Sequence, residues 1–192
     1  MTDRNTLYEG VSHAAWGYLF YYLDINLGTV SILPRFVGCL LLLSAIRCLS
    51  EERRDLALLR PFGILLTLWS GADWIASWMG RTLDEWFLPL NLVVSVASLY
   101  FHFQLFTDLA ALAAAYQQPG DNLDRRLLRW RTVHVALTTS AALAAACLPA
   151  VDIQIEYFIF LAVIAAPVAL CLMAALFSLR KLFQEGTDTL RT

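Results

Sequence analysis

Three histidines are the residues of this chain best suited to hold a metal ion or to relay protons: His13, His102 and His134. Imidazole is the commonest transition-metal ligand and can also hold haem. Each histidine lies in a different predicted helix, however, and no HExxH or comparable ligand spacing is present. All three are expected near the cytoplasmic boundary of the membrane topology derived below, where amphipathic side chains occur for other reasons. We favour that interpretation over a shared metal or haem site, and we predict no cofactor.

A polar stripe is the second candidate and would serve as a ligand site. Four residues spaced i, i+4, i+7 and i+11 lie on one face of a predicted helix: Asn91, Ser95, Ser98 and His102. Inside a helix bundle, such a stripe can line a pocket or a pathway. It can equally hold two helices together through hydrogen bonds, and this structural role is the commoner one.

Asp24 and Asn26 form the third candidate. A carboxylate at membrane depth is costly and marks a functional site by default. The sequence Asp-x-Asn-x-Gly also resembles the start of a calcium-binding loop. Gly28 takes the fifth position and Arg35 the twelfth, where such a loop needs an oxygen ligand and a glutamate. We therefore favour a structural interpretation, a helix end at which Asp24 is exposed or paired with Arg35.

Asp73 lies among Trp69, Trp74 and Trp78 of a predicted helix. Tryptophans near a helix end are typical of the aromatic belt at a membrane surface. The alternative is an aromatic-walled cavity in which the carboxylate binds an organic cation. We favour the belt, although Asp73 lies far enough inside the helix to need a polar partner.

The composition predicts that membrane-spanning helices position these residues. Of the 192 residues, 59% are hydrophobic and 16% are charged, against about 45–50% and 25% in a soluble domain. The mean hydropathy is +0.60, and several apolar blocks approach the ~18–20 residues that cross a bilayer. The net charge of −2 and the lack of a basic tract give no indication of nucleic-acid binding. The four cysteines occur singly, so neither disulfides nor cysteine metal ligands are predicted.

The predicted fold is an all-α polytopic membrane bundle of about six transmembrane helices with short connectors, forming one domain over residues 1–192. The helices are expected at residues 11–27, 35–49, 61–79, 86–115, 128–149 and 155–181. On this arrangement 12 of the 14 Lys and Arg residues fall on one side, and Arg35 and Arg81 fall on the other. Because cytoplasmic loops are rich in Lys and Arg, we predict a multi-pass protein of the cell membrane with both termini in the cytoplasm.

The stretch DINLGTVSILPRFVG, with LLLSAI and LYFHFQLFTDLA further along, resembles a pattern in a family of small multi-pass bacterial membrane proteins of uncharacterised function. The resemblance covers much of the chain. It implies a multi-pass membrane fold in a bacterial protein. It implies no activity, ligand or catalytic residue.

Three functions are compatible with these patterns. The first is a transporter of a small molecule or ion, or its substrate-binding membrane subunit. The chain is similar in size and predicted topology to the substrate-binding subunits of energy-coupling-factor vitamin transporters. The second is a non-enzymatic accessory or scaffold subunit that binds a membrane partner, or a second copy, through the small residues of 128–149. The third is an enzyme at the inner interface that uses His102, His134 and Asp108. We favour the first function and expect a protein in the lipid bilayer that is not an enzyme.

Overall fold

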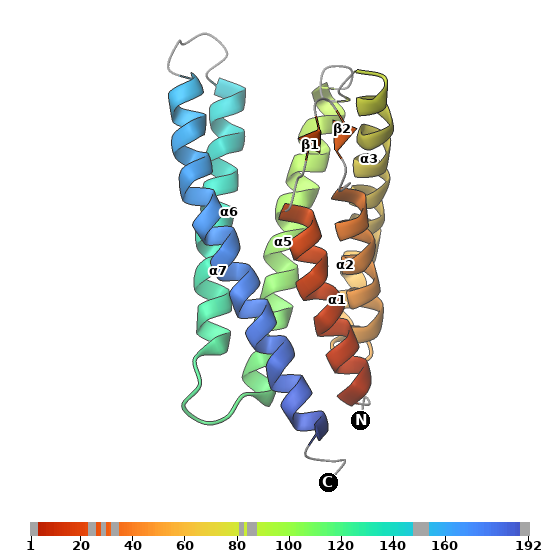
Figure 1. The fold of residues 1–192 in the computed structure, drawn as a ribbon, viewed down its shortest axis with the longest axis vertical. Coiled ribbons are helices and arrows are strands. Elements are labelled where there is room, and N and C mark those ends of the chain that lie inside the picture. Colours follow the sequence, from red (N-terminus) through yellow and green to blue (C-terminus); the bar gives the residue numbers. More distant parts are fainter. Residues whose placement is uncertain are drawn as a thin grey trace.

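The computed structural model describes residues 4–22, 26–27, 30–31, 35–80, 83, 88–147 and 154–188. Within these ranges the chain is all-α, with six α-helices, one 3-10 helix and one short hairpin of two antiparallel strands (Figure 1). The elements occur in the order α1 (Arg4–Tyr22), β1 (Asn26–Leu27), β2 (Val30–Ser31), α2 (Arg35–Leu49), the 3-10 helix η1 (Arg54–Leu59), α3 (Arg60–Trp78), α5 (Leu88–Tyr116), α6 (Leu123–Cys147) and α7 (Gln154–Asp188).

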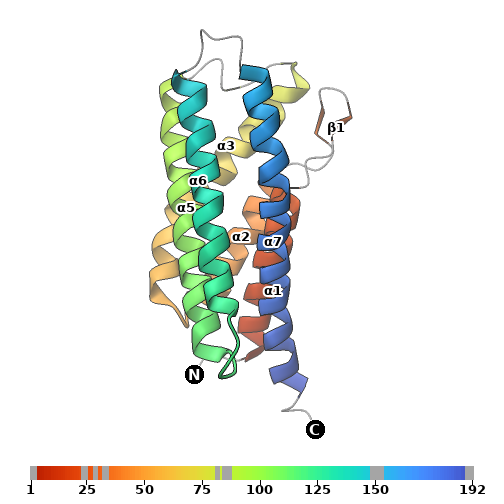
Figure 2. The same ribbon diagram turned by 90° about the vertical axis from the view of Figure 1, so that its left-hand side faces the viewer.

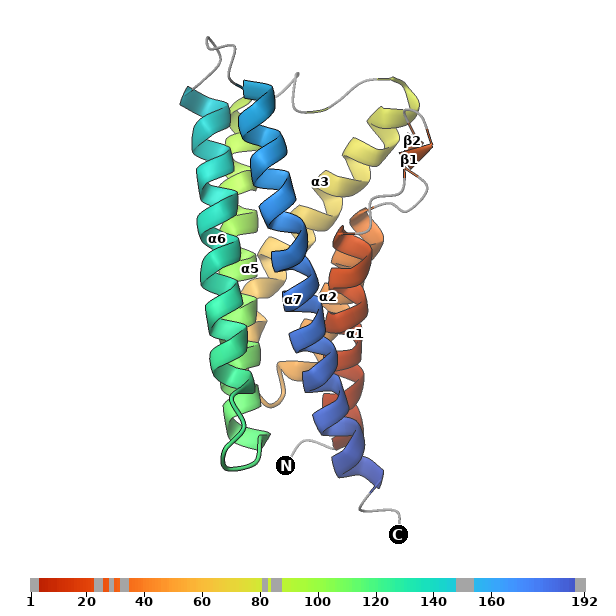
Figure 3. The ribbon, with the colours of Figure 1, turned by 60° about the vertical axis from the view of Figure 1, so that its left-hand side comes forward.

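The six α-helices run along the long axis of the molecule, and successive helices point in alternate directions (Figure 1). Each helix packs on its neighbours in the cyclic order α1, α2, α3, α5, α6, α7, and α7 closes the ring against α1 (Figure 2). α3 is inclined to the other helices (Figure 3). α1 begins and α7 ends at the same end of the bundle, as an even number of antiparallel helices requires.

The sequence placed α2 correctly at both ends, at residues 35–49, but misplaced α1, which was expected at residues 11–27. The observed helix begins at Arg4 and ends at Tyr22. It begins early because Leu7, Val11, Ala14 and Tyr18 form a buried seam that extends into the polar N-terminal segment. It ends early because Asn26 pairs with Ser31 and Leu27 with Val30 in the β1–β2 hairpin, so the predicted termination near Gly28 was wrong.

The remaining predicted helices are present, with shifted ends. α3 and α5 agree with their predicted ranges within a few residues. α6 begins at Leu123, five residues before its predicted start, and α7 extends to Asp188, seven residues beyond its predicted end. Both extensions are polar, so a search for apolar blocks omits them although the helices continue through them.

α1 and α2 approach each other backbone to backbone through glycines. A Cβ atom on Gly38 would lie 2.8 Å from the carbonyl oxygen of Gly17 and 2.8 Å from the backbone nitrogen of Tyr21. A Cβ atom on Gly10 would lie 2.7 Å from Cγ of Leu49. Small residues at such contacts let two helices pack closely, as they do in membrane bundles. The short distance brings α1 into the interior of the bundle.

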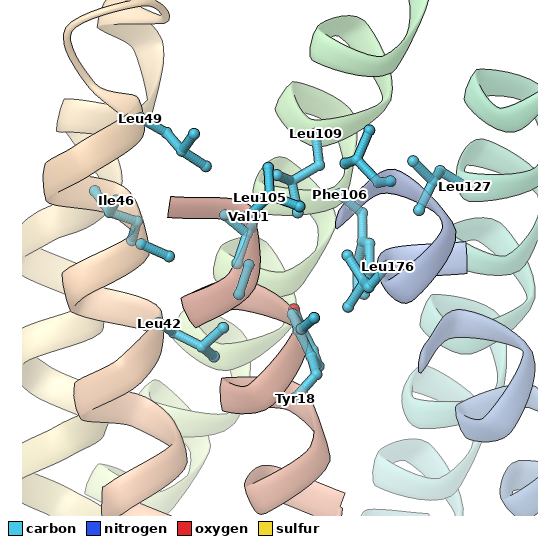
Figure 4. Close-up of a cluster of buried hydrophobic side chains, with 14 of the residues drawn as sticks. Val11, Tyr18, Leu42, Ile46, Leu49, Leu105, Phe106, Leu109, Leu127 and Leu176 are labelled. Atoms are coloured by element: carbon cyan, nitrogen blue, oxygen red, sulfur yellow. The ribbon is translucent and has the colours of Figure 1, made fainter. Parts of the chain in front are cut away.

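The apolar core lies where α1 meets α2, α5 and α7 (Figure 4). Its side chains are fully or almost fully buried and come from α1, α2, α5, α6 and α7: Val11, Tyr18, Leu42, Ile46, Leu49, Leu105, Phe106, Leu109, Leu127 and Leu176. Tyr18 is the only residue labelled in this view that carries a polar side-chain atom, its hydroxyl. The core therefore surrounds a buried phenol that needs a hydrogen-bond partner.

Two helix segments, Leu90–Tyr116 and Ile159–Glu185, are long and apolar enough to cross a membrane. The prediction of six spans is therefore not confirmed by length and composition. α2 has 15 residues, which gives about 22 Å of helix against a hydrocarbon core of about 30 Å. α6 is long enough, but it carries four arginines within its first nine residues.

The glycine contact between α1 and α2 gives a first testable prediction. Gly38→Ala should lower the stability of the purified protein by about 1–3 kcal/mol, because the added methyl group overlaps the backbone of α1. Gly71→Ala is the matched control, since a Cβ atom there meets nothing within 4 Å. That variant should be neutral or gain up to about 1 kcal/mol from better helix propensity. Thermal unfolding in detergent, followed by circular dichroism, measures both, and equal stability of the two variants would contradict the contact.

Candidate functional site

The buried phenol of Tyr18 meets a buried histidine. The hydroxyl of Tyr18, on α1, lies 2.7 Å from Nδ1 of His102, on α5. Both side chains are buried, and His102 is only 4% exposed. Phe106 covers the pair, with its ring centroid 4.7 Å from that of Tyr18. This is a short hydrogen bond between two helices that are far apart in the sequence.

A second tyrosine and histidine pair lies beside the first. The hydroxyl of Tyr22, one helical turn after Tyr18, lies 3.2 Å from Nδ1 and 3.1 Å from Nε2 of His134, on α6. The ring centroids of His102 and His134 are 6.1 Å apart, and their planes are nearly perpendicular at 85°. The two pairs therefore form one group in which α1, α5 and α6 meet.

Tyr21 completes this group, which we call the Tyr–His cluster: Tyr18, Tyr21, Tyr22, His102 and His134. The three tyrosines are spaced i, i+3 and i+4, so α1 directs them to one side. The ring centroid of Tyr21 lies 4.9 Å from that of His102, and its side chain hydrogen-bonds Ser98. Each member is a phenol or an imidazole, and each of these groups can both donate and accept a hydrogen bond.

One nitrogen of His102 is left without a partner. Nε2 of His102 is buried and makes no hydrogen bond within the described part of the chain. Nδ1 already belongs to the bond with Tyr18. A buried nitrogen without a partner is rare and costly in proteins, so this atom makes the cluster a candidate binding site.

Two residues of the predicted polar stripe lie at the cluster, and the other two lie beyond it. Ser98 and His102 face α1, whereas Ser95 is exposed and Asn91 is half-buried. The end of α1 explains this difference. Tyr21 bonds Ser98, and α1 ends at the next residue, Tyr22. α1 therefore does not extend to the next turn of α5, where Ser95 lies.

The three histidines, predicted as one candidate set, separate in the structure. His102 and His134 come together, but His13 lies on another part of α1, with its Nδ1 3.3 Å from the hydroxyl of Ser44 on α2. Within the described ranges, no three His, Cys, Asp or Glu side chains are placed to share a metal ion. Their predicted depth, near the cytoplasmic boundary, stays a prediction.

Two of the predicted carboxylates, Asp108 and Asp73, are described, and their hydrogen-bond partners lie outside the cluster. Asp108 is buried six residues beyond His102 on α5 and accepts hydrogen bonds from Nε2 of Gln104 at 3.1 and 3.2 Å. Asp73 accepts one from the backbone N–H of Leu83 at 3.3 Å. Asp24 lies outside the described residues, and only the backbone of Asn26 is described, in β1. The proposed roles of these last two residues are therefore untested.

Tyr18, Tyr21 and Tyr22 are the site residues that the sequence analysis missed. Tyrosines at helical spacing are most often packing residues, and the same pattern without a polar partner would be only that. The histidine partners of Tyr18 and Tyr22 lie 84 and 112 residues away in the sequence. No local pattern encodes such a pairing. The available signal was the coincidence of three phenols on one helix with two histidines on two other apolar helices.

Comparison with known proteins gives no family to which the cluster can be assigned. No family model matches the chain, and neither a curated protein nor a solved structure does. The resemblance to small multi-pass bacterial membrane proteins therefore stays a prediction. The function has to be argued from the geometry of this chain alone.

Proposed function

We propose that this chain is an integral membrane protein in which all six α-helices are inserted in the bilayer. The distribution of polar and apolar side chains supports this. Large apolar side chains face outward on several helices, including Leu68 at 68%, Val163 at 66% and Leu92 at 65% exposure. His102, Asp108 and His134 are instead buried. Lipid, unlike water, stabilises an apolar exterior around a polar interior.

The distribution of basic residues supports cytoplasmic termini. Of the basic residues within the described ranges, only Arg35 lies at the end of the bundle where α1 stops. The connections at the other end, where α1 begins, and the helix turns that flank them carry most of the rest: Arg47, Arg53, Arg54, Arg60, Arg125, Arg126 and Arg129. An excess of Arg and Lys is typical of the cytoplasmic side.

The short helices α1 and α2 fit into the bilayer as a connected pair. Their connection includes the β1–β2 hairpin, in which the strands satisfy part of each other's backbone hydrogen bonding. Non-helical backbone is tolerated at membrane depth only where protein covers it. The β1–β2 hairpin therefore lies within the outer part of the bilayer, beside α3, which contacts β2.

Labelling of single cysteines tests this topology. In a background with Cys39, Cys48, Cys147 and Cys171 replaced by alanine, Met79→Cys should react with a membrane-impermeant maleimide in intact spheroplasts. Glu51→Cys and Gln118→Cys should react only after the membrane is disrupted. These positions are exposed and flank α3 and α5. Labelling of residues 51 and 79 from the same side would show that α3 does not cross.

We further propose that this bundle binds a small molecule or ion for transport, alone or as the substrate-binding membrane subunit of a transporter. The buried, unpartnered Nε2 of His102 carries this proposal. Polar groups in a membrane interior are expensive and usually mark substrate or ion pathways. The hydrogen bond that joins α1 to α5 uses only Nδ1 of His102, so Nε2 is available to bind a ligand.

Native mass spectrometry in mild detergent tests the binding function. The full-length protein should carry a small molecule or ion at one per chain, and His102→Phe should remove it. His13→Phe is the matched control, because His13 is a half-buried histidine of the same bundle that lies outside the cluster. A protein partner at a fixed ratio, with no ligand mass, would contradict the proposal and favour the accessory subunit.

A further inference from the structure

We propose that the substrate of the Tyr–His cluster is a transition-metal cation, copper or zinc, bound by His102 and His134. This inference rests on the proposed transport function and names its substrate class. Three observations support it: the hydrogen bonds of the two imidazoles, their separation and the ligand types present.

His102 has the bonding pattern of a metal-ligating histidine. A metal-bound imidazole uses one nitrogen for the ion and bonds a partner with the other, which fixes the orientation of the ring. In His102, Nδ1 is held at 2.7 Å by the hydroxyl of Tyr18, and Nε2 is buried and unpartnered. Tyr18 is thus placed to orient the ring and to leave Nε2 available for a cation.

His134 also retains an available nitrogen. The hydroxyl of Tyr22 lies within hydrogen-bond range of both Nδ1 and Nε2, at 3.2 and 3.1 Å. A neutral imidazole carries a single N–H, and when that N–H donates to the Tyr22 oxygen, the other ring nitrogen keeps its lone pair. The other nitrogen can then bind an ion without loss of the contact with Tyr22.

The separation of the rings fits an ion shared between them. Metal–nitrogen bonds of about 2.0–2.1 Å on each side, added to the two ring radii, place the centroids of a bridged pair about 5–6.5 Å apart. The observed separation is 6.1 Å. At this separation α5 and α6 need not move apart when an ion binds. Only the two rings, whose planes are nearly perpendicular at 85°, need to turn about their side-chain bonds.

The ligand types select the class of cation. Imidazole suits copper and zinc, whereas magnesium and calcium require oxygen ligands. Beside the two imidazoles, the hydroxyl of Tyr22 offers a further oxygen donor. Within the described ranges no third His, Cys, Asp or Glu converges on the site. A site with open positions binds an ion less tightly than a closed structural site. It therefore suits an ion that must enter and leave.

Equilibrium dialysis of the purified full-length protein tests this inference. The protein, stripped with a chelator, is dialysed against Zn²⁺, or against Cu⁺ under a reductant, and the bound metal is measured by mass spectrometry. We expect one ion per chain in the wild-type protein and none in His102→Phe or His134→Phe. Tyr18→Phe should weaken binding about 10–100-fold, because it removes only the partner that orients His102. His13→Phe should bind as the wild-type protein does.

Two further measurements guard against false readings. The dialysis is repeated with the four cysteines replaced by alanine, because thiols bind both metals, and the result should not change. Circular dichroism and size-exclusion chromatography establish that each variant is folded. Metal retained by the folded double variant His102→Phe/His134→Phe, or no stoichiometric metal in the wild-type protein, would overturn the inference. A small-molecule mass found without metal would overturn the metal site and leave the transport function standing.

Discussion

The close packing of α1 against α2 is the constraint on which the rest of the structure depends. Gly17 and Gly38 leave no room for a side chain between the two backbones, so α1 lies deep in the ring of helices. From there its tyrosines can contact α5 and α6, which do not adjoin α2 in the ring. A wider separation would shift α1 and with it the phenols that hold both histidines. The glycines therefore determine the geometry of a site to which they contribute no atom.

The Tyr–His cluster buries polar side chains, which costs stability, but its hydrogen bonds hold three helices together. Two imidazoles and three phenols occupy an interior that is otherwise filled by leucine and phenylalanine. Their hydrogen bonds join α1 to α5 and α1 to α6, and they fix the rotation of α1 relative to both. The unpartnered nitrogen of His102 adds nothing to this fixation. That available nitrogen underlies the proposed binding role.

The sequence predicted the helices better than the site, for physical reasons. Apolar runs are local, so α2 was found at residues 35–49 without error, and the stripe that contains Ser98 and His102 was found from its spacing alone. The end of α1 was missed because pairing of Asn26 with Ser31 in the hairpin overrides the apolar run. The pairing of Tyr18 with His102 depends on how whole helices pack, and spacing along one helix carries no such information. For the same reason, spacing along the chain could not show that His102 and His134 lie together while His13 lies apart from them.

The residues of the cluster lie far apart in the sequence, so they are synthesised at different times. Tyr18 is synthesised 84 residues before His102, which at about 5–20 residues per second is roughly 4–17 s of translation. The α1–α2 pair is therefore complete while its phenols have no native partner, and water or the insertion machinery must satisfy them. His134 follows later still, and α7, which closes the ring against α1, comes last. The Tyr–His cluster is thus completed only when α6 has been made, and α7 then closes the ring against α1.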